Sequence, residues 1–201
     1  MVSANTNWTN NVRDSRERKA RYFMQERQAY MVEMLHHIAA ACRTAKRKRI
    51  KLCVRPNGST NIAYEGLRVV IMPSLAAELS KISGHEVTAG VHTIFSAFPK
   101  VQFVDYSKNP KRFERELPPN YDLTFSRSET INRRHQELER GHNVAAVFAG
   151  TMPEAWNGFR VINGDEHDLR HLDPKGVVVG LTPKGNKARH DMSGFVVRQA
   201  A

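Results

Sequence analysis

Short apolar segments alternate with helical patterns along most of this chain, and the apolar segments end abruptly in polar residues. Two of these segments, 144–148 and 177–181, are nearly continuous apolar runs, as expected for strands covered on both faces of a parallel sheet. Strands that alternate with helices are typical of consecutive βα units. About six strands are expected, fewer than the eight of a closed barrel. The sequence therefore predicts an α/β fold with a partial or open, (β/α) barrel-like parallel sheet.

The longest helical pattern lies near the N-terminus. Apolar residues recur at spacings of three, four and seven from about Asn11 to Ala45, which predicts one long helix with basic residues on its other face. Residues 1–10 are expected to form a flexible tail, and residues 11–201 a single α/β domain. Further helices are expected at 67–83, 91–98 and 129–141, and strands at 50–54, 101–106, 121–125, 144–148, 159–162 and 177–181.

Most of the positive charge lies in the N-terminal part of the chain. Of a formal net charge of +11, residues 1–51 contribute +8, with 12 Lys and Arg against 4 Asp and Glu. This distribution favours a polyanionic partner such as nucleic acid. The alternative is a solvated helix face, whose last cations are stabilised by the helix dipole. The candidate nucleic-acid-binding residues are Arg43, Lys46, Arg47, Lys48 and Arg49.

Apolar segments and cysteines indicate the compartment. No run of about 18 apolar residues occurs, so no membrane association is expected, and residues 1–11 lack the apolar core of a secretion signal. Cys42 and Cys53 are the two cysteines of the chain. Two thiols build no disulfide framework and complete no zinc or iron–sulfur site alone. We therefore expect a cytoplasmic protein, with no cofactor held by this chain.

Polar residues follow four of the expected strands. Because ligands of parallel α/β proteins bind at the carboxyl ends of strands, these residues are expected to share a pocket. Arginine binds a phosphate or carboxylate through two hydrogen bonds, and lysine binds it as a point charge. The alternative for each residue is a role in a turn or cap. The candidate ligand-binding residues are Arg55, Asn57, Ser59, Lys108, Ser126, Glu129, Asp165, Asp168 and Arg170.

The C-terminal third holds two further polar segments. Asp165, His167, Asp168 and His171 are residue types that bind metals, but their spacing matches no zinc-protease motif, and no metal site is expected. Residues 184–194 are basic and rich in glycine, so they either cover the pocket or form an ordinary surface loop. They lack the lysine–hydroxyl ending of a P-loop. No cysteine–histidine pairing is evident in the sequence.

Several strand-end motifs follow one another in order. They are Arg55-Pro56-Asn57-Gly58-Ser59 with Glu65 downstream, Asp105-Tyr106-Ser107-Lys108, the run from Leu123 to Glu129, and a block of Gly164-Asp165, Asp168, Arg170 and Leu172-Asp173-Pro174 that continues into Val179-Gly180-Leu181, Lys184-Gly185, Ala188 and Asp191-x-Ser193-Gly194-Phe195. Over about residues 12–198, these motifs together resemble a phage and prophage family of radical-SAM-like barrel proteins that has no firmly assigned activity.

The sequence departs from this family at a point that bears on chemistry. Family members that look like radical enzymes carry a cysteine cluster just before the segment corresponding to 12–34, whereas residues 1–11 contain no cysteine. A [4Fe–4S] cluster is held by thiolates, and radical cleavage of S-adenosylmethionine needs the cluster. This chain alone is therefore not expected to perform that chemistry. Asn61 and Tyr64 stand where the family usually has Asp and Trp, and His171 stands where it prefers Phe.

Three functions remain open at this point. The first is a cluster-less partial barrel that binds a nucleotide or nucleic acid in the phage-infected cell, through the strand-end residues and the basic helix. The second is an enzyme fragment or split radical-SAM-like enzyme completed by another chain, or a cluster-free enzyme. The third is a module that binds a host or phage protein. Acid–base candidates for an enzyme are Asp105, Tyr106, Glu129 and Asp165.

Overall fold

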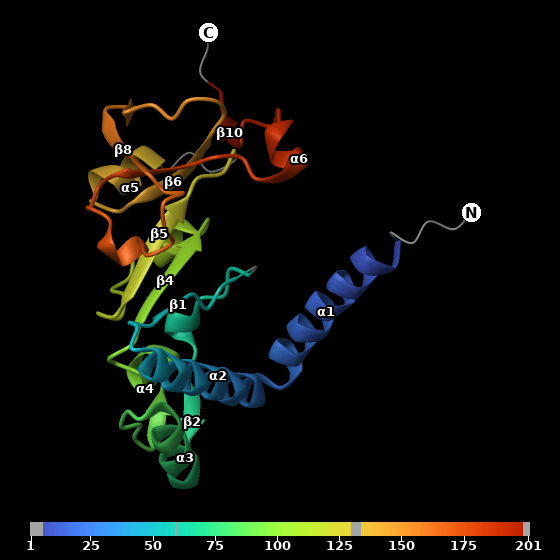
Figure 1. The fold of residues 1–201 in the computed structure, drawn as a ribbon, viewed down its shortest axis with the longest axis vertical. Helices are drawn as coiled ribbons and strands as arrows, with labels where there is room; N and C mark the ends of the chain where they lie inside the picture. Colours follow the sequence, from blue (N-terminus) through green and yellow to red (C-terminus); the bar gives the residue numbers. More distant parts are fainter. Residues whose placement is uncertain (1–5, 59, 130–133, 199–201) are drawn as a thin grey trace. The chain divides into compact units, whose positions relative to one another are not determined.

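The computed structural model describes residues 6–58, 60–129 and 134–198, shown in Figure 1. The chain forms two compact units. The first comprises Met1–Leu52 and Leu67–Phe98, and the second comprises Cys53–Gly66 and Pro99–Ala201. The expected tail over residues 1–10 and single domain over residues 11–201 stay predictions.

The first unit is built around α2 (Arg27–Lys48). Met31, Leu35 and Ile38 recur on one face of this helix and are at most 2% exposed, as the apolar stripe of an amphipathic helix should be. The helix contacts α3, α4 and β2, and β2 pairs antiparallel with β3. The other elements of this unit are α1 (Thr6–Gln25), β2 (Val69–Ile71), α3 (Pro73–Ser83), β3 (Gly90–His92) and α4 (Ile94–Ala97).

Two helices occupy the segment where one long helix was expected. They are separated at Glu26, which has φ −124° and ψ 48°, outside the helical region. Tyr30 packs edge-on against the rings of Tyr22 and Phe23 across this junction. The apolar periodicity continues through the single non-helical residue, so the sequence pattern does not reveal it. Neither helix, nor any other in the described residues, is long and apolar enough to cross a membrane.

The second unit carries the mostly parallel sheet that the sequence predicts. Its strand order is β1-β4-β5-β6-β9-β8-β7, and only β7 and β8 pair antiparallel along this path. Within the described residues, β1 and β7 are open edges, so the sheet is not a closed barrel. The elements are β1 (Cys53–Val54), η1 (Tyr64–Gly66), β4 (Gln102–Ser107), η2 (Pro110–Arg112), β5 (Tyr121–Ser126), α5 (Arg134–Glu139), β6 (Val144–Phe148), β7 (Ala155–Trp156), β8 (Phe159–Asn163), η3 (Arg170–Leu172), β9 (Val178–Leu181), α6 (Gly185–Arg189) and β10 (Val196–Val197), where η marks a 3₁₀ turn.

One edge of β6 is shared by two strands. The first two residues of β6 pair with β5, and the last two, Val147 and Phe148, pair with β10. The amide of Arg127, just after β5, still donates a hydrogen bond to the carbonyl of Ala145 in β6. Beyond this point β10 replaces β5 as the neighbour of β6. The C-terminal segment therefore returns to the middle of the sheet, next to the carboxyl ends of the strands.

Two expected helices are strands in their first residues. The segment expected to be helical from residue 67 starts as β2, and α3 begins at Pro73, a residue that suits the first helical position. The segment 91–98 divides into β3 and α4, and Thr93 caps α4 by accepting a hydrogen bond from the Ser96 amide at 3.1 Å. The helix expected at 129–141 appears as α5, and residues 130–133 of that prediction lie outside the described residues.

Candidate functional site

A cleft with a volume of about 280 Å³ lies at the carboxyl ends of the parallel strands in the second unit. Four of its lining side chains are charged, and three of these are basic. Three expected ligand-binding residues, Arg55, Ser126 and Asp168, come together in this lining. We call it the strand-end cleft, and it is lined by Arg55, Tyr106, Ser126, Arg127, Ala145, Val147, Asp168, Leu181, Lys184 and Phe195.

Arg55 reaches the cleft from the loop that follows β1. Its guanidinium carbon lies 4.6 Å from the centroid of the Tyr106 ring, a distance typical of cation–π contact. Among the described residues, no carboxylate lies within ion-pair distance of Arg55. Burial is the largest cause of the raised pKa of Tyr106; Arg170 opposes the rise and Asp168 adds to it. The phenol therefore stays neutral at physiological pH.

Arg127 joins the loop after β5 to the C-terminal segment. Its Nη1 donates hydrogen bonds to the carbonyl oxygens of Gly194 and Phe195, both at 2.7 Å. These bonds hold Phe195 in the wall of the cleft. The expected ligand residue Lys108 lies beside this wall rather than in the lining, with its Nζ 4.9 Å from the centroid of the Phe195 ring.

Lys184 enters the cleft from the segment after β9. Its Nζ lies 3.3 Å from the carboxylate of Asp165, which also accepts hydrogen bonds from the amide and hydroxyl of Thr182 at 2.7 and 2.8 Å. Partial burial favours a higher pKa for Asp165, but Thr182 and Lys184 together hold the pKa of this carboxyl below its ordinary value. Asp165, an expected ligand residue, is thus engaged in positioning Lys184.

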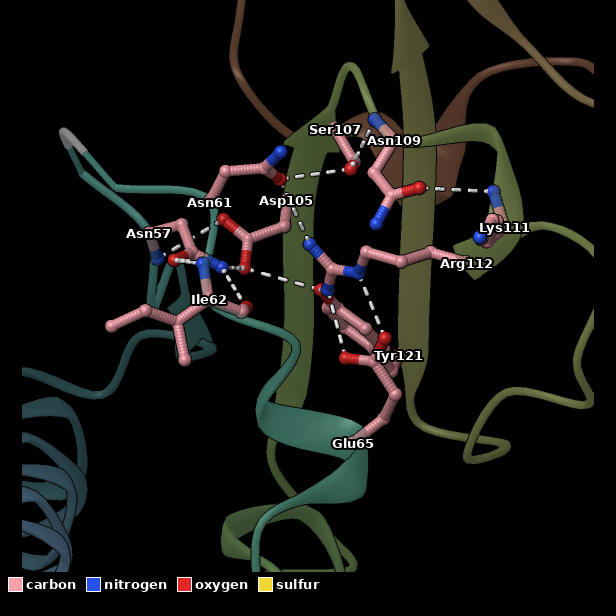
Figure 2. Close-up of polar contacts among 10 residues, drawn as sticks. All are labelled: Asn57, Asn61, Ile62, Glu65, Asp105, Ser107, Asn109, Lys111, Arg112 and Tyr121. Carbon is pink, nitrogen blue, oxygen red and sulfur yellow. Dashed lines mark hydrogen bonds and ion pairs between the residues drawn. The ribbon is translucent and has the colours of Figure 1, made fainter. Parts of the chain in front are cut away.

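A buried polar network fixes the loop that carries Arg55. Asp105 in β4 is fully buried and accepts hydrogen bonds from the amide and Nδ2 of Asn57 at 3.1 and 2.8 Å, and from the Tyr121 hydroxyl at 3.2 Å (Figure 2). Burial raises the pKa of Asp105, and the hydrogen bonds from Asn57 and Tyr121 offset part of this rise. Asn57, an expected ligand residue, is 2% exposed and lies outside the cleft lining.

Arg112 completes this network, as Figure 2 shows. Its Nε and Nη2 donate to the two carboxylate oxygens of Glu65 at 2.7 and 2.8 Å, and Nη2 also donates to the Tyr121 hydroxyl at 2.7 Å. Burial favours a lower pKa for Arg112, but the carboxylate of Glu65 and the other neighbours keep that pKa above its ordinary value. The guanidinium therefore stays charged, and it joins η1 to the sheet.

The comparison with known families is decided by one match. A family model described as gene product 88 matches residues 2–199. The chain belongs to the gene product 88 family. No curated protein and no solved structure matches it. The phage-type part of the expected resemblance is confirmed by this match, and the radical-SAM-like part stays a prediction.

Three expected ligand residues of this gene product 88 protein remain to be placed. Arg170 is fully buried, its Nη1 lies 3.3 Å from the carboxylate of Asp173, and it is not part of the cleft lining. Glu129 is exposed in the segment after β5 and also lies outside the lining. Ser59 lies outside the described residues. The motif around Arg170 therefore contributes both a buried ion pair and, through Asp168, a cleft residue.

The expected nucleic-acid-binding residues form an exposed cluster at the end of α2, in the first unit. Arg49 ends the helix in the left-handed conformation, with φ 54°, and its amide bonds the carbonyls of Ala45 and Lys46. Five cations lie at this end of the helix, and the negative end of the helix dipole stabilises them there. We call these residues the α2 basic cluster; they are Arg43, Lys46, Arg47, Lys48 and Arg49.

The structure brings one cysteine close to a histidine, which the sequence did not suggest. The Sγ of Cys53 lies 3.9 Å from Nδ1 of His171. Burial raises the pKa of the Cys53 thiol, and the charge of Asp122 adds to this rise, so the contact does not produce a reactive thiolate. In the described part of the chain, no three His, Cys, Asp or Glu side chains are grouped as metal ligands.

Seven of the ten cleft residues were absent from the expected ligand set, among them Arg127, Lys184 and Phe195. Arg127 directly follows Ser126, so the strand-end rule would have found it if it had been applied one residue further. Lys184 lies in the basic segment for which covering the pocket was one of two alternatives. Phe195 gives no local signal, because its place depends on the pairing of β10 with β6.

Proposed function

We propose that this gene product 88 protein binds the phosphate of a nucleotide, free or within a nucleic acid, in the strand-end cleft. The observation that carries the proposal is the composition of the lining, where three basic side chains meet one carboxylate and two aromatic rings. Arginine and lysine are the residues that hold phosphate oxygens. Aromatic rings and guanidinium planes are surfaces on which bases stack.

The location of the cleft supports the same proposal. In open parallel sheets, ligands bind outside the carboxyl ends of the strands, and the lining residues follow or end β1, β4, β5 and β9. The buried network of Asp105 and Arg112 holds the Arg55 loop in place before any ligand arrives. Such preorganisation lowers the entropic cost of binding.

The test is a binding titration at two salt concentrations. A fluorescent nucleotide and short labelled RNA and DNA strands are titrated with the full chain at about 50 and 200 mM salt, and binding should weaken as salt rises. The variant Arg55→Ala/Lys184→Ala should bind at least about tenfold more weakly, because two of the three cations that line the cleft are removed. The matched control is Lys100→Ala/Arg115→Ala, which removes two exposed cations of the same unit outside the lining. Absence of binding to every probe, or an equal weakening in both double variants, would falsify the proposal.

Radical chemistry does not follow from the residues of this chain. An iron–sulfur cluster is held by several thiolates, and the two cysteines, Cys42 and Cys53, lie in different units. These residues do not fit a cluster, so we derive no step through one. A radical-SAM-like ancestry remains a hypothesis, and the open parallel sheet with a cleft at its strand ends is the feature that supports it.

A further inference from the structure

We infer that the occupant of the strand-end cleft is a single nucleoside phosphate, whose base stacks on the Arg55–Tyr106 pair and presents an N–H group to Asp168. This inference rests on the proposed function and makes it more specific, because it distinguishes a nucleotide from a simple phosphate ester. It also orients the ligand within the cleft, with the base near β1 and β4 and the phosphate near β5 and β9.

The strand order separates two chemically different ends of the cleft. Arg55 follows β1 and Tyr106 lies in β4, whereas Arg127 follows β5 and Lys184 follows β9. From β4 to β9 the sheet advances by three strand spacings, or about 14 Å. The β1–β4 end carries a stacked cation and ring, and the other end carries Arg127 and Lys184, of which Lys184 is paired with Asp165. A ligand that matches both ends has a planar group and an anionic group some distance apart.

The Arg55–Tyr106 pair is suited to a base. The guanidinium lies over the phenol ring at 4.6 Å from its centroid, and Arg55 is an exposed residue in the lining. Bases stack on arginine planes and aromatic rings in known modes of recognition.

Asp168 sets the polarity of the ligand. It lines the same cleft, and it lies two residues before η3, which contacts β4 and β5. An ionised carboxylate accepts hydrogen bonds and donates none, and it repels phosphate. The anionic group is therefore expected at the Arg127–Lys184 end, and N–H donors of the base at the Asp168 end.

The volume limits the size of the occupant. At about 280 Å³, the cleft is slightly smaller than the usual small-molecule site, which has a volume of about 300–1,000 Å³. One nucleotide unit suits this space better than a dinucleotide. A strand of nucleic acid would leave the cleft after one unit, so its other nucleotides would lie elsewhere on the surface.

Calorimetric titration of the full chain with three kinds of ligand tests the inference. The ligands are inorganic phosphate, ribose 5-phosphate and the four common ribonucleoside 5′-monophosphates. At least one monophosphate should bind about tenfold or more tightly than ribose 5-phosphate, since base stacking contributes this much. Arg55→Ala should remove most of this advantage, whereas Tyr106→Phe, which retains the ring, should preserve it. The exposed Arg115→Ala, outside the lining, serves as the unchanged control.

Asp168→Ala provides a readout that damage to the fold would not imitate. It should weaken the preferred monophosphate and leave ribose 5-phosphate unchanged or bound more tightly, because a repulsive charge is removed. If ribose 5-phosphate binds as tightly as every monophosphate, the inference is wrong while the proposed function stands. If no phosphate-bearing ligand binds at all, both are wrong. Equal weakening of all ligands by Asp168→Ala also overturns the assigned role of that residue.

Discussion

Arg112 and Glu65 form an ion pair with two hydrogen bonds, and their side chains are only 4% and 7% exposed. The pair joins η1 to the sheet, next to the loop that presents Arg55. Removing one partner of a buried pair leaves an uncompensated charge, which is far more costly than removing both.

Arg112→Met should lower the free energy of unfolding by about 3–5 kcal/mol, measured by urea denaturation. The double variant Arg112→Met/Glu65→Met should be more stable than this single variant, because neither charge remains buried. Arg115→Met, at an exposed position, should change stability by no more than about 0.5 kcal/mol. A double variant less stable than Arg112→Met would contradict the role assigned to the pair.

Asp105 should make stability depend on pH in a definite direction. Burial raises the pKa of this carboxyl, so the native state binds its proton more tightly than the unfolded chain does. The contribution of Asp105 is then fully present below the ordinary aspartate pKa and is lost as the pH rises through the raised value. The unfolding free energy of the protein minus that of Asp105→Asn, which does not titrate at this position, should therefore fall as the pH increases above about 4. Urea denaturation across this range measures it, and a difference that grows with pH would refute the assignment.

Gly164 should not tolerate a methyl group. A Cβ at this position would lie 2.8 Å from the carbonyl oxygen of Gly180 and 2.5 Å from a methyl of Val179. Because the backbone oxygen cannot move away freely, Gly164→Ala should destabilise the protein by about 1–3 kcal/mol. The matched control is Gly66→Ala, where a Cβ would meet nothing within 4 Å. Thermal unfolding compares the two, and equal midpoints would rule out the close approach.

Arg127 should hold the C-terminal segment on the sheet. Arg127→Met removes the hydrogen bonds to the carbonyls of Gly194 and Phe195. The amides of Val196 and Val197 should then exchange with deuterium at least about tenfold faster, because local opening becomes easier. Hydrogen-exchange mass spectrometry of the C-terminal peptide reports this rate. Arg160→Met, at an exposed position in β8, should leave the rate unchanged; unchanged exchange in Arg127→Met as well would argue against the anchor.

The α2 basic cluster should contribute to nucleic-acid binding separately from the cleft. Arg47→Glu/Lys48→Glu should weaken binding of single-stranded RNA and DNA and reduce the slope of log affinity against log salt by about 0.7 for each phosphate that the protein no longer neutralises. Arg68→Glu/Lys81→Glu changes the charge by the same amount at exposed positions of the same unit. If both variants behave alike, the effect belongs to net charge and not to the cluster.

Much of the sheet could be predicted because its strands have a local signature. The segment 144–148 was expected with the bounds that β6 has, and β9 lies within its expected segment. Strands of two or three residues, such as β2, β3 and β10, could not be predicted this way. Their existence depends on partners far along the chain, and so short a segment shows no periodicity.

The candidate site, like the sheet, could be predicted only in part. Arg55, Ser126 and Asp168 were found because strand ends meet at one edge of a parallel sheet. Asn57 and Arg170 also follow strands, but their side chains are buried in hydrogen bonds and an ion pair. Sequence position alone does not tell whether a strand-end side chain faces a ligand or the protein. Arg112 went unnoticed because the loop residue that it binds, Glu65, lies far from it in the chain.

The shared edge of β6 has a consequence for the newly made chain. β6 is synthesised before β10. On the edge that faces β5, Val147 and Phe148 therefore have no strand partner until Val196 and Val197 emerge from the ribosome. An unpaired edge invites pairing with other chains. By covering this edge, β10 also opposes self-association. A chain made without β10 should aggregate in the cell.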